Sequence, residues 1–171
     1  MKFLEKDLEE IIYETYNKDR VQLARRGLNI CGVVKRQLRI GNYGVADLVT
    51  FEKEYDYEYE YECEEAIKCY SVPYLIITVY ELKKDKIGIS AYLQAVKYTK
   101  GLQEYFNEKG FNQEIKFNIV LIGNDIDSSG SFCFIPSIFN NVDFYKYSYD
   151  VDGLVFERQN GYCLTNNGFK L

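Results

Sequence analysis

Two residues of opposite charge lie at the end of the most apolar stretch of the chain. Glu81 and Lys83 stand two positions apart in YELK, which closes the run from Val72 to Leu82. Alternate residues of a β-strand project from one face, so both side chains can serve a single site if this run is a strand. The alternative is that both are ordinary solvated charges at a strand end.

A second carboxylate interrupts another apolar segment. Asp47 stands inside the run VADLVTF, which spans Val45 to Phe51. An unpaired buried charge is costly, so such a residue usually has a metal ion, a cation or hydrogen-bond donors as its partner. An exposed position at a sheet edge is the alternative. Further polar candidates come from two predicted helices: Glu9 on the first, and Gln94, Lys97 and Tyr98 on the second.

The residue types that are absent restrict the chemistry. The chain has no histidine, which excludes Ser-His and Cys-His nucleophile pairs and the commonest general base near neutral pH. Five cysteines are an odd number without CxxC spacing, so we expect reduced, mostly structural thiols instead of a zinc site. Any catalysis must therefore rest on carboxylates, lysine or a bound metal ion.

The elements that must position these residues follow an α/β pattern. Apolar residues at helical spacing predict helices over residues 3–16 and 90–106. Runs of apolar and β-branched residues predict strands over 28–38, 45–51, 72–82 and 116–122. The first two form a hairpin through a turn at Ile40 to Gly44. FYKYSY and GLVFER predict two short strands as a β-rich C-terminal extension.

Residues 52–65 alternate tyrosine with acidic residues. The sequence EYDYEYEYECEE has a period of two, which favours an exposed hairpin arm or an edge strand over disorder. Tyrosines can stack on unpaired bases, but acidic neighbours repel phosphates. Packing along a strand ribbon or a protein interface is the better interpretation. Residues 54–65 are therefore a candidate site for a protein partner.

The charge of the chain is unevenly distributed. The net charge is -5, yet the segment from Lys18 to Arg39 holds seven basic residues and the single acid Asp19. This segment predicts a local phosphate-binding surface, and plain solvated charges on a helix end and a hairpin are the alternative. The candidate nucleic-acid contacts are Arg25, Arg26, Lys35, Arg36, Arg39, Lys97 and Tyr98.

The chain reads as one domain over residues 1–171. No flexible linker separates its parts, because there are two prolines and no Ser/Gly tract. The first residues carry charges every few positions, unlike a signal peptide or a membrane span. We therefore expect an intracellular, cytoplasmic protein with no membrane partner.

Taken together, these motifs resemble the PD-(D/E)xK nuclease superfamily, and within it the structure-specific and RecB-like branch. The likeness covers about residues 3–106 and is carried by EKDLE, RQLR, ADLV, VYELK and LQAVKY. It implies a restriction-endonuclease-like αβββαβ core, with a central mixed sheet flanked by helices. The acidic, tyrosine-rich residues from about 52 to 71 would be an inserted hairpin. Ala46 stands where the superfamily has its eponymous proline, and the gap from Asp47 to Glu81 is long.

The resemblance also implies roles for individual residues. Asp47 and Glu81 would ligate Mg²⁺ or Mn²⁺, and Glu9 would complete or support the metal shell. Lys83 would position the attacking water, and Gln94 would contact substrate or water. Hard divalent cations independently favour carboxylate oxygens, which are the residue types present.

The expected function is divalent-metal-dependent hydrolysis of phosphodiester bonds, in DNA ahead of RNA. The alternative is a non-catalytic nucleic-acid-binding or protein-binding module on a nuclease-like scaffold, with a regulatory or host-interaction role. Fold alone does not choose between them. Endonuclease or exonuclease action, and assembly as a homodimer, are left open by the sequence.

Overall fold

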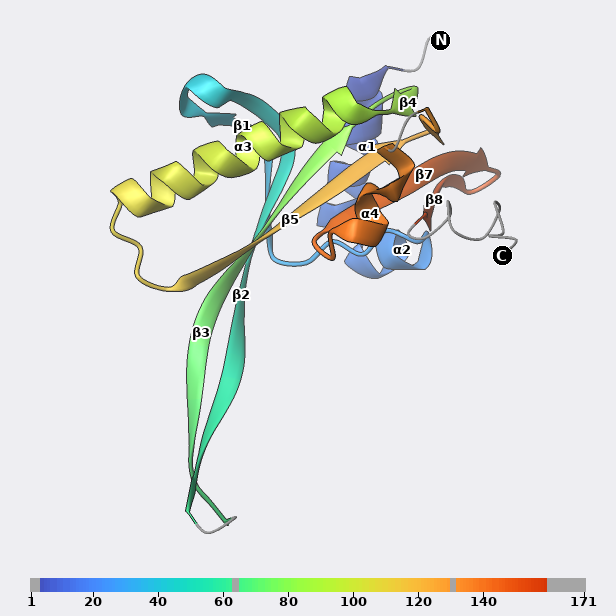
Figure 1. Cartoon of the computed structure of the whole chain (residues 1–171). Coiled ribbons are helices and arrows are strands. Elements are labelled where there is room, and N and C mark those ends of the chain that lie inside the picture. The colour runs from blue at the N-terminus through green and yellow to red at the C-terminus, as the bar shows by residue number, and fades with distance from the viewer. Residues whose placement is uncertain (1–3, 63–64, 130–131, 160–171) are drawn as a thin grey trace, which may run out of the picture.

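A mixed β-sheet organises the chain. The computed structural model describes residues 4–62, 65–129 and 132–159, and within them the side chains outside 58–70. Over these residues the main sheet has six strands in the order β1-β2-β3-β5-β7-β8 (Figure 1). β1, β2 and β3 pair antiparallel, β5 and β7 add in parallel, and β8 returns antiparallel to β7. The bounds are β1 Val33–Ile40, β2 Gly44–Glu62, β3 Glu65–Leu82, β5 Glu114–Gly123, β7 Val142–Asp150 and β8 Gly153–Arg158.

Helices cover both faces of this sheet. α3 (Ile89–Glu108) lies on one face, and α1 (Glu5–Lys18) with α2 (Arg20–Arg25) lies on the other (Figure 1). α3 joins β3 to β5, because parallel neighbours need a crossover connection. The described residues also form smaller elements: the short paired strands β4 (Lys86–Ile87) and β6 (Asp125–Ile126), the helix α4 (Ile135–Ile138), and the 3-10 turns η1 (Gly41–Tyr43) and η2 (Phe132–Phe134).

Alternate residues of the central strands form two separate cores. Val79 and Leu121 pack under α3 with Ala95 and Leu102 of that helix. The next residues along the strands face α1 and form the second core: Leu48, Tyr80, Leu82, Val120 and Ile122, with Leu8 and Ile12 of the helix. Each fully buried aliphatic side chain contributes about 1.5–3 kcal/mol, so these two layers fix which strand residues point to which face.

Most of the predicted elements are confirmed, with shifted ends. Two corrections concern the segment between α1 and β1. The strand expected over 28–38 starts only at Val33, because Leu28 and Ile30 are buried in the α1-side core without strand pairing and Gly32 turns the chain with a φ of 80°. The helix α2 was not predicted, although Asp19 caps it by accepting a hydrogen bond from the Gln22 N–H at 3.1 Å.

The acidic, tyrosine-rich segment is a hairpin arm, as predicted. β2 and β3 run on past the sheet together and project from the body (Figure 1). β1 pairs with β2 only as far as Phe51, and β5 pairs with β3 only from Tyr74 onward. The arm therefore continues two core strands without a break, and its outer part has two strands.

The two cysteines whose side chains are described differ in their state. Cys31 is a free thiol, but Cys133 is disulfide-bonded, so the expectation of reduced thiols is wrong for Cys133. Within the described part of the chain, no helix is both long enough and apolar enough to cross a membrane.

Candidate functional site

Asp47 and Glu81 come together because β2 and β3 are antiparallel neighbours. Leu48 pairs with Tyr80, which places the preceding Asp47 beside Glu81 at the end of the ladder. The Leu82 N–H donates a hydrogen bond of 2.9 Å to Asp47 Oδ2. This bond holds the Asp47 carboxylate next to the segment from Glu81 to Lys83. The three side chains are close enough to form the single site that the sequence predicts.

The β1–β2 hairpin is irregular where it carries Asp47. Ala46 belongs to the α3-side core, whereas Leu48 belongs to the α1-side core, so β2 changes faces at Asp47. Gln37, at the corresponding position of β1, has a φ of 49°, an uncommon conformation for a residue other than glycine. Strained backbone of this kind is retained where the surrounding structure enforces it. Here the strained residue and Asp47 stand opposite each other, where the ladder between β1 and β2 is interrupted.

Glu81 is a buried carboxylate that is only half satisfied. It is 1% exposed, and Lys83 Nζ donates a hydrogen bond of 2.7 Å to its Oε1. Its Oε2 is also buried and has no hydrogen-bond partner among the described residues. Burial, and then the charge of Asp47, raise the pKa of Glu81 to about 7, against the opposing effect of the Lys83 bond. The carboxylate is therefore paired with Lys83 through one oxygen, and its other oxygen is left without a partner among the described residues.

Two more acidic groups act on the same place. Burial raises the pKa of Asp47, and the charges of Glu9 and Glu5 raise it further. Glu5 also contacts Lys83, with 3.4 Å between Oε1 and Nζ. Glu5 was missed in the sequence, although it precedes Glu9 by four residues and therefore lies on the same face of α1.

Glu9 is held by side chains of β1. It is 3% exposed, and its two oxygens accept hydrogen bonds from Arg36 Nε and from Gln37 Nε2. Each oxygen therefore already has a donor from the protein. This arrangement suits a residue that supports the site and fixes Arg36, ahead of one that ligates a metal ion directly.

α3 carries Tyr98 near the two carboxylates: burial raises the pKa of Tyr98, and the charges of Glu81 and Asp47 raise it further. Gln94 Nε2 donates to the Tyr98 hydroxyl at 2.7 Å. Tyr98 is 4% exposed and lies against Gly44, where an added Cβ would be 3.1 Å from the tyrosine ring. Tyr98 therefore lies beneath the site as a packing residue, and Gln94 is the more accessible of the two.

A cleft opens next to Asp47. It has a volume of about 440 Å³ and is lined by Glu5, Lys6, Glu9, Arg36, Gln37 and Asp47. Of the predicted nucleic-acid contacts, Arg36 lines this cleft, while Lys35, Arg39 and Lys97 are exposed on β1 and α3. Arg25 and Arg26 lie at the end of α2 instead. Arg26 is bonded to Asp150 and to the Leu154 and Gly153 carbonyls, so it anchors the β7–β8 hairpin.

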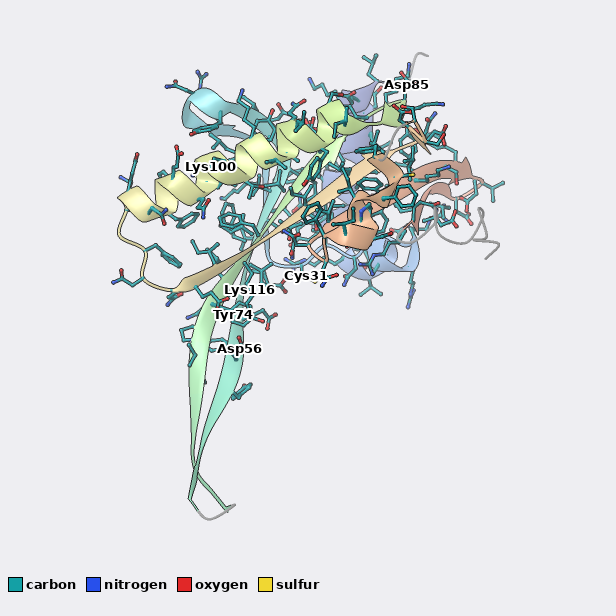
Figure 2. All side chains as sticks on the ribbon, in the orientation of Figure 1. Cys31, Asp56, Tyr74, Asp85, Lys100 and Lys116 are labelled. Carbon is teal, nitrogen blue, oxygen red and sulfur yellow. The ribbon has the colours of Figure 1, made fainter. Side chains whose placement is uncertain are left out.

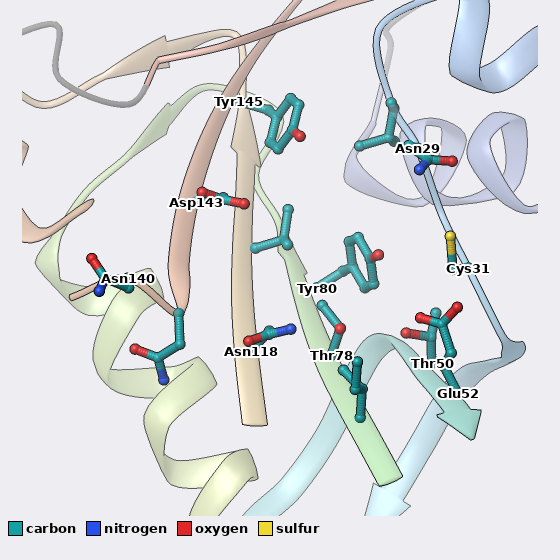
Figure 3. A pocket seen from close by; sticks show the side chains of 14 residues that line it. Asn29, Cys31, Thr50, Glu52, Thr78, Tyr80, Asn118, Asn140, Asp143 and Tyr145 are labelled. Carbon is teal, nitrogen blue, oxygen red and sulfur yellow. The ribbon is translucent and has the colours of Figure 1, made fainter. Parts of the chain in front are cut away.

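A second hollow, of about 230 Å³, lies on the α1 face of the sheet (Figure 3). Thr78, Tyr80, Asn118, Asp143 and Tyr145 are among the residues that line it. No lysine or arginine is among its described lining residues, and Glu52 adds a second carboxylate. This hollow is therefore a poor place for a phosphate group.

The donor set at Asp47 and Glu81 fits a hard divalent cation. Among the residues whose positions are described, no group of three or more His, Cys, Asp or Glu side chains is arranged to hold a metal ion. Magnesium, however, is usually bound by one or two carboxylates and keeps several waters. The buried, unpartnered Glu81 Oε2 and the adjacent Asp47 provide that kind of site.

Comparison with known proteins does not assign a family. No protein-family model matches the chain, and neither curated proteins nor solved structures give a match. The interpretation of the site therefore depends on its own geometry. That geometry consists of two adjacent desolvated carboxylates, a lysine bonded to one of them, and a cleft beside the other.

Proposed function

We propose that the chain is a divalent-metal-dependent phosphodiesterase acting on DNA, with a restriction-endonuclease-like core. The observation that carries this proposal is the buried Glu81 carboxylate, which is bonded to Lys83 through one oxygen and unpartnered at the other. Lys83 offsets one of the two negative charges of Glu81 and Asp47, and the remaining charge disfavours folding in this desolvated site unless a further cation binds. A purely structural pair of this kind has no evident benefit for the protein.

The order of elements supports the same proposal. α1, the strands β1 to β3, α3 and β5 follow one another as an αβββαβ core requires, with α2 and β4 as additions. The carboxylates lie at the ends of β2 and β3, between α1 and α3. The cations of β1 and α3 are exposed and would contact a phosphate backbone outside the cleft.

The roles of the side chains follow from their contacts. Asp47 and Glu81 would hold Mg²⁺ or Mn²⁺, which when bound lowers the pKa of a water and offsets charge on the phosphate. Lys83 has three N–H donors, and its contacts with Glu81 and Glu5 use two, which leaves one for the attacking water. Glu9 holds Arg36 at the cleft, where the guanidinium can meet a phosphate. Gln94, which donates one hydrogen bond to Tyr98, would contact water or substrate from α3.

The test combines metal binding with cleavage. Calorimetry of the intact chain with Mg²⁺ or Mn²⁺ should give binding that Asp47→Asn abolishes. DNA cleavage should require the same ion, stop on chelation, and fall by at least about a hundredfold in Asp47→Asn. Glu10→Gln, an exposed carboxylate on α1, is the charge-matched control. Metal binding without cleavage of any DNA or RNA substrate would favour the non-catalytic binding module, and neither binding nor cleavage would overturn the proposed site.

A further inference from the structure

The arm and one corner of the body carry opposite charges. Residues 52–65 contain eight acidic residues and one lysine, whereas residues 18–39 contain seven basic residues and one acid. Part of the basic set is already neutralised within the chain, because Arg26 is paired with Asp150 and Arg36 with Glu9. The exposed remainder next to α2 consists of Lys18, Arg20 and Arg25, which we call the basic corner.

The arm has little structural support of its own. From the pair Tyr55 and Pro73 outward, β2 and β3 pair only with each other. Two-stranded ribbons are marginally stable in water unless something packs on them. Tyr55 is 45% exposed and Tyr57 is 64% exposed, so large aromatic side chains of this ribbon are open to a partner.

The root of the arm is poorly suited to binding a partner by addition of a further β-strand. Pro73 stands where β3 leaves β5, and it has no N–H to donate to an added strand. Pairing of one arm with another would bring two strongly acidic ribbons side by side, and the repulsion of their like charges is destabilising. The arm is therefore suited to docking through its side chains on a cationic surface.

One contact inside the chain already shows this chemistry. Lys116 Nζ lies 3.2 Å from Asp56 Oδ2 and 3.7 Å from the centre of the Tyr74 ring, at the root of the arm (Figure 2). A carboxylate and a tyrosine on the same ribbon thus bind one ammonium together. The outer arm repeats acidic and tyrosine residues, but it extends away from the cations of its own body (Figure 1).

We propose that the arm docks on the basic corner of a second copy of the chain, in a reciprocal two-fold dimer. Each copy carries both surfaces, so two equivalent contacts close the pair, as an isologous interface requires. α2 lies on the side of the body from which the arm projects, so two copies can face each other with their arms antiparallel (Figure 1). This inference does not rest on the proposed nuclease activity.

Sedimentation analysis of the full chain tests the proposal by charge exchange. The intact chain should be dimeric at low ionic strength and dissociate as salt rises, because exposed charge pairs are screened. An arm variant (Glu58→Lys with Glu62→Lys, both on the outer part of β2) and a corner variant (Arg20→Glu with Arg25→Glu) should each weaken association by at least roughly a hundredfold. Mixing the two variants should restore a dimer, since one contact then pairs lysines with glutamates and the other keeps the native charges.

Controls separate docking from misfolding. Circular dichroism and urea unfolding should show that each variant is folded, and Glu10→Lys with Glu108→Lys makes the same charge change at exposed sites outside both surfaces. That control should leave the dimer intact. A chain that stays monomeric at low salt, a dimer that persists in both variants, or a mixture that stays monomeric would each overturn the proposal.

Discussion

Replacing Glu81 by glutamine should make the metal-free protein more stable at high pH while removing metal binding. The substitution keeps the size of the side chain and its ability to accept from Lys83, but it removes the charge. In the folded chain the pKa of Glu81 is raised from 4.5 to about 7. The protonated carboxyl therefore favours folding below about pH 4.5, and this contribution is lost as the pH rises through about 7.

The size of the effect follows from the two pKa values. Each pH unit between 4.5 and about 7 corresponds to about 1.4 kcal/mol, so ionised Glu81 costs about 3 kcal/mol of folding free energy above pH 7. Glutamine does not ionise and avoids this cost. For a chain of 171 residues, about 3 kcal/mol raises the melting temperature by roughly 6–12 °C.

The assay is urea unfolding of the native chain and Glu81→Gln over a series of pH values in EDTA. The stability difference between the two proteins should be small below about pH 4.5 and grow to about 3 kcal/mol above pH 7. Saturating Mg²⁺ should narrow the difference, because it stabilises only the native chain. Glu10→Gln removes an exposed charge and should show no such divergence. Parallel stability curves for the native chain and Glu81→Gln would refute the assigned burial and charge of Glu81.

Three further perturbations test neighbouring parts of the site. Lys83→Met removes the hydrogen bond that lowers the pKa of Glu81, so the pH at which Mg²⁺ binding reaches half its maximum should rise. Calorimetry over a pH series measures this midpoint, and an unchanged value would contradict the contact between Lys83 and Glu81. Gly44→Ala should lower the free energy of unfolding by about 1–3 kcal/mol, because Gly44 has a φ of 120° and its new Cβ would press on Tyr98; urea unfolding measures this loss. Arg39→Ala with Lys97→Ala should reduce the salt dependence of DNA binding by roughly one unit of log-log slope per lost phosphate contact, whereas Arg26→Ala should destabilise the fold and leave the slope unchanged.

Periodicity was sufficient to place the central elements. The strands that carry Asp47 and Glu81 contain apolar runs, and the helix after them repeats apolar residues at helical spacing. Each segment could therefore be predicted as a strand or a helix from the sequence. That Asp47 and Glu81 share one site was implied by the nuclease resemblance, whereas the antiparallel pairing of β2 with β3 that joins them was not predicted. The strand prediction was wrong for Leu28 to Gly32, because a loop without β-sheet hydrogen bonds can also bury apolar side chains. Nothing local in a sequence distinguishes those two outcomes.

The contacts of Glu9 and Gln37 were beyond sequence reasoning for a different reason. Glu9 was expected near the site, but its engagement by Arg36 and Gln37 depends on a change of face at Gln37, which has a φ of 49°. Glutamine gives no local signal for that conformation, since it is imposed by packing on both sides of the hairpin. The tertiary structure, and not the motif, gives both oxygens of Glu9 a donor from the protein and leaves Glu81 Oε2 without one among the described residues.

Three costs to folding coincide within one stretch of two strands. Glu81 is buried with an unpartnered oxygen, Asp47 is desolvated beside it, and the backbone opposite Asp47 is strained at Gln37. A sequence shaped only by stability would replace such groups, because apolar or neutral residues of similar size would remove the costs. Local rules are broken together mainly where function requires it. That coincidence is an argument for a site here that does not depend on any likeness to a nuclease motif.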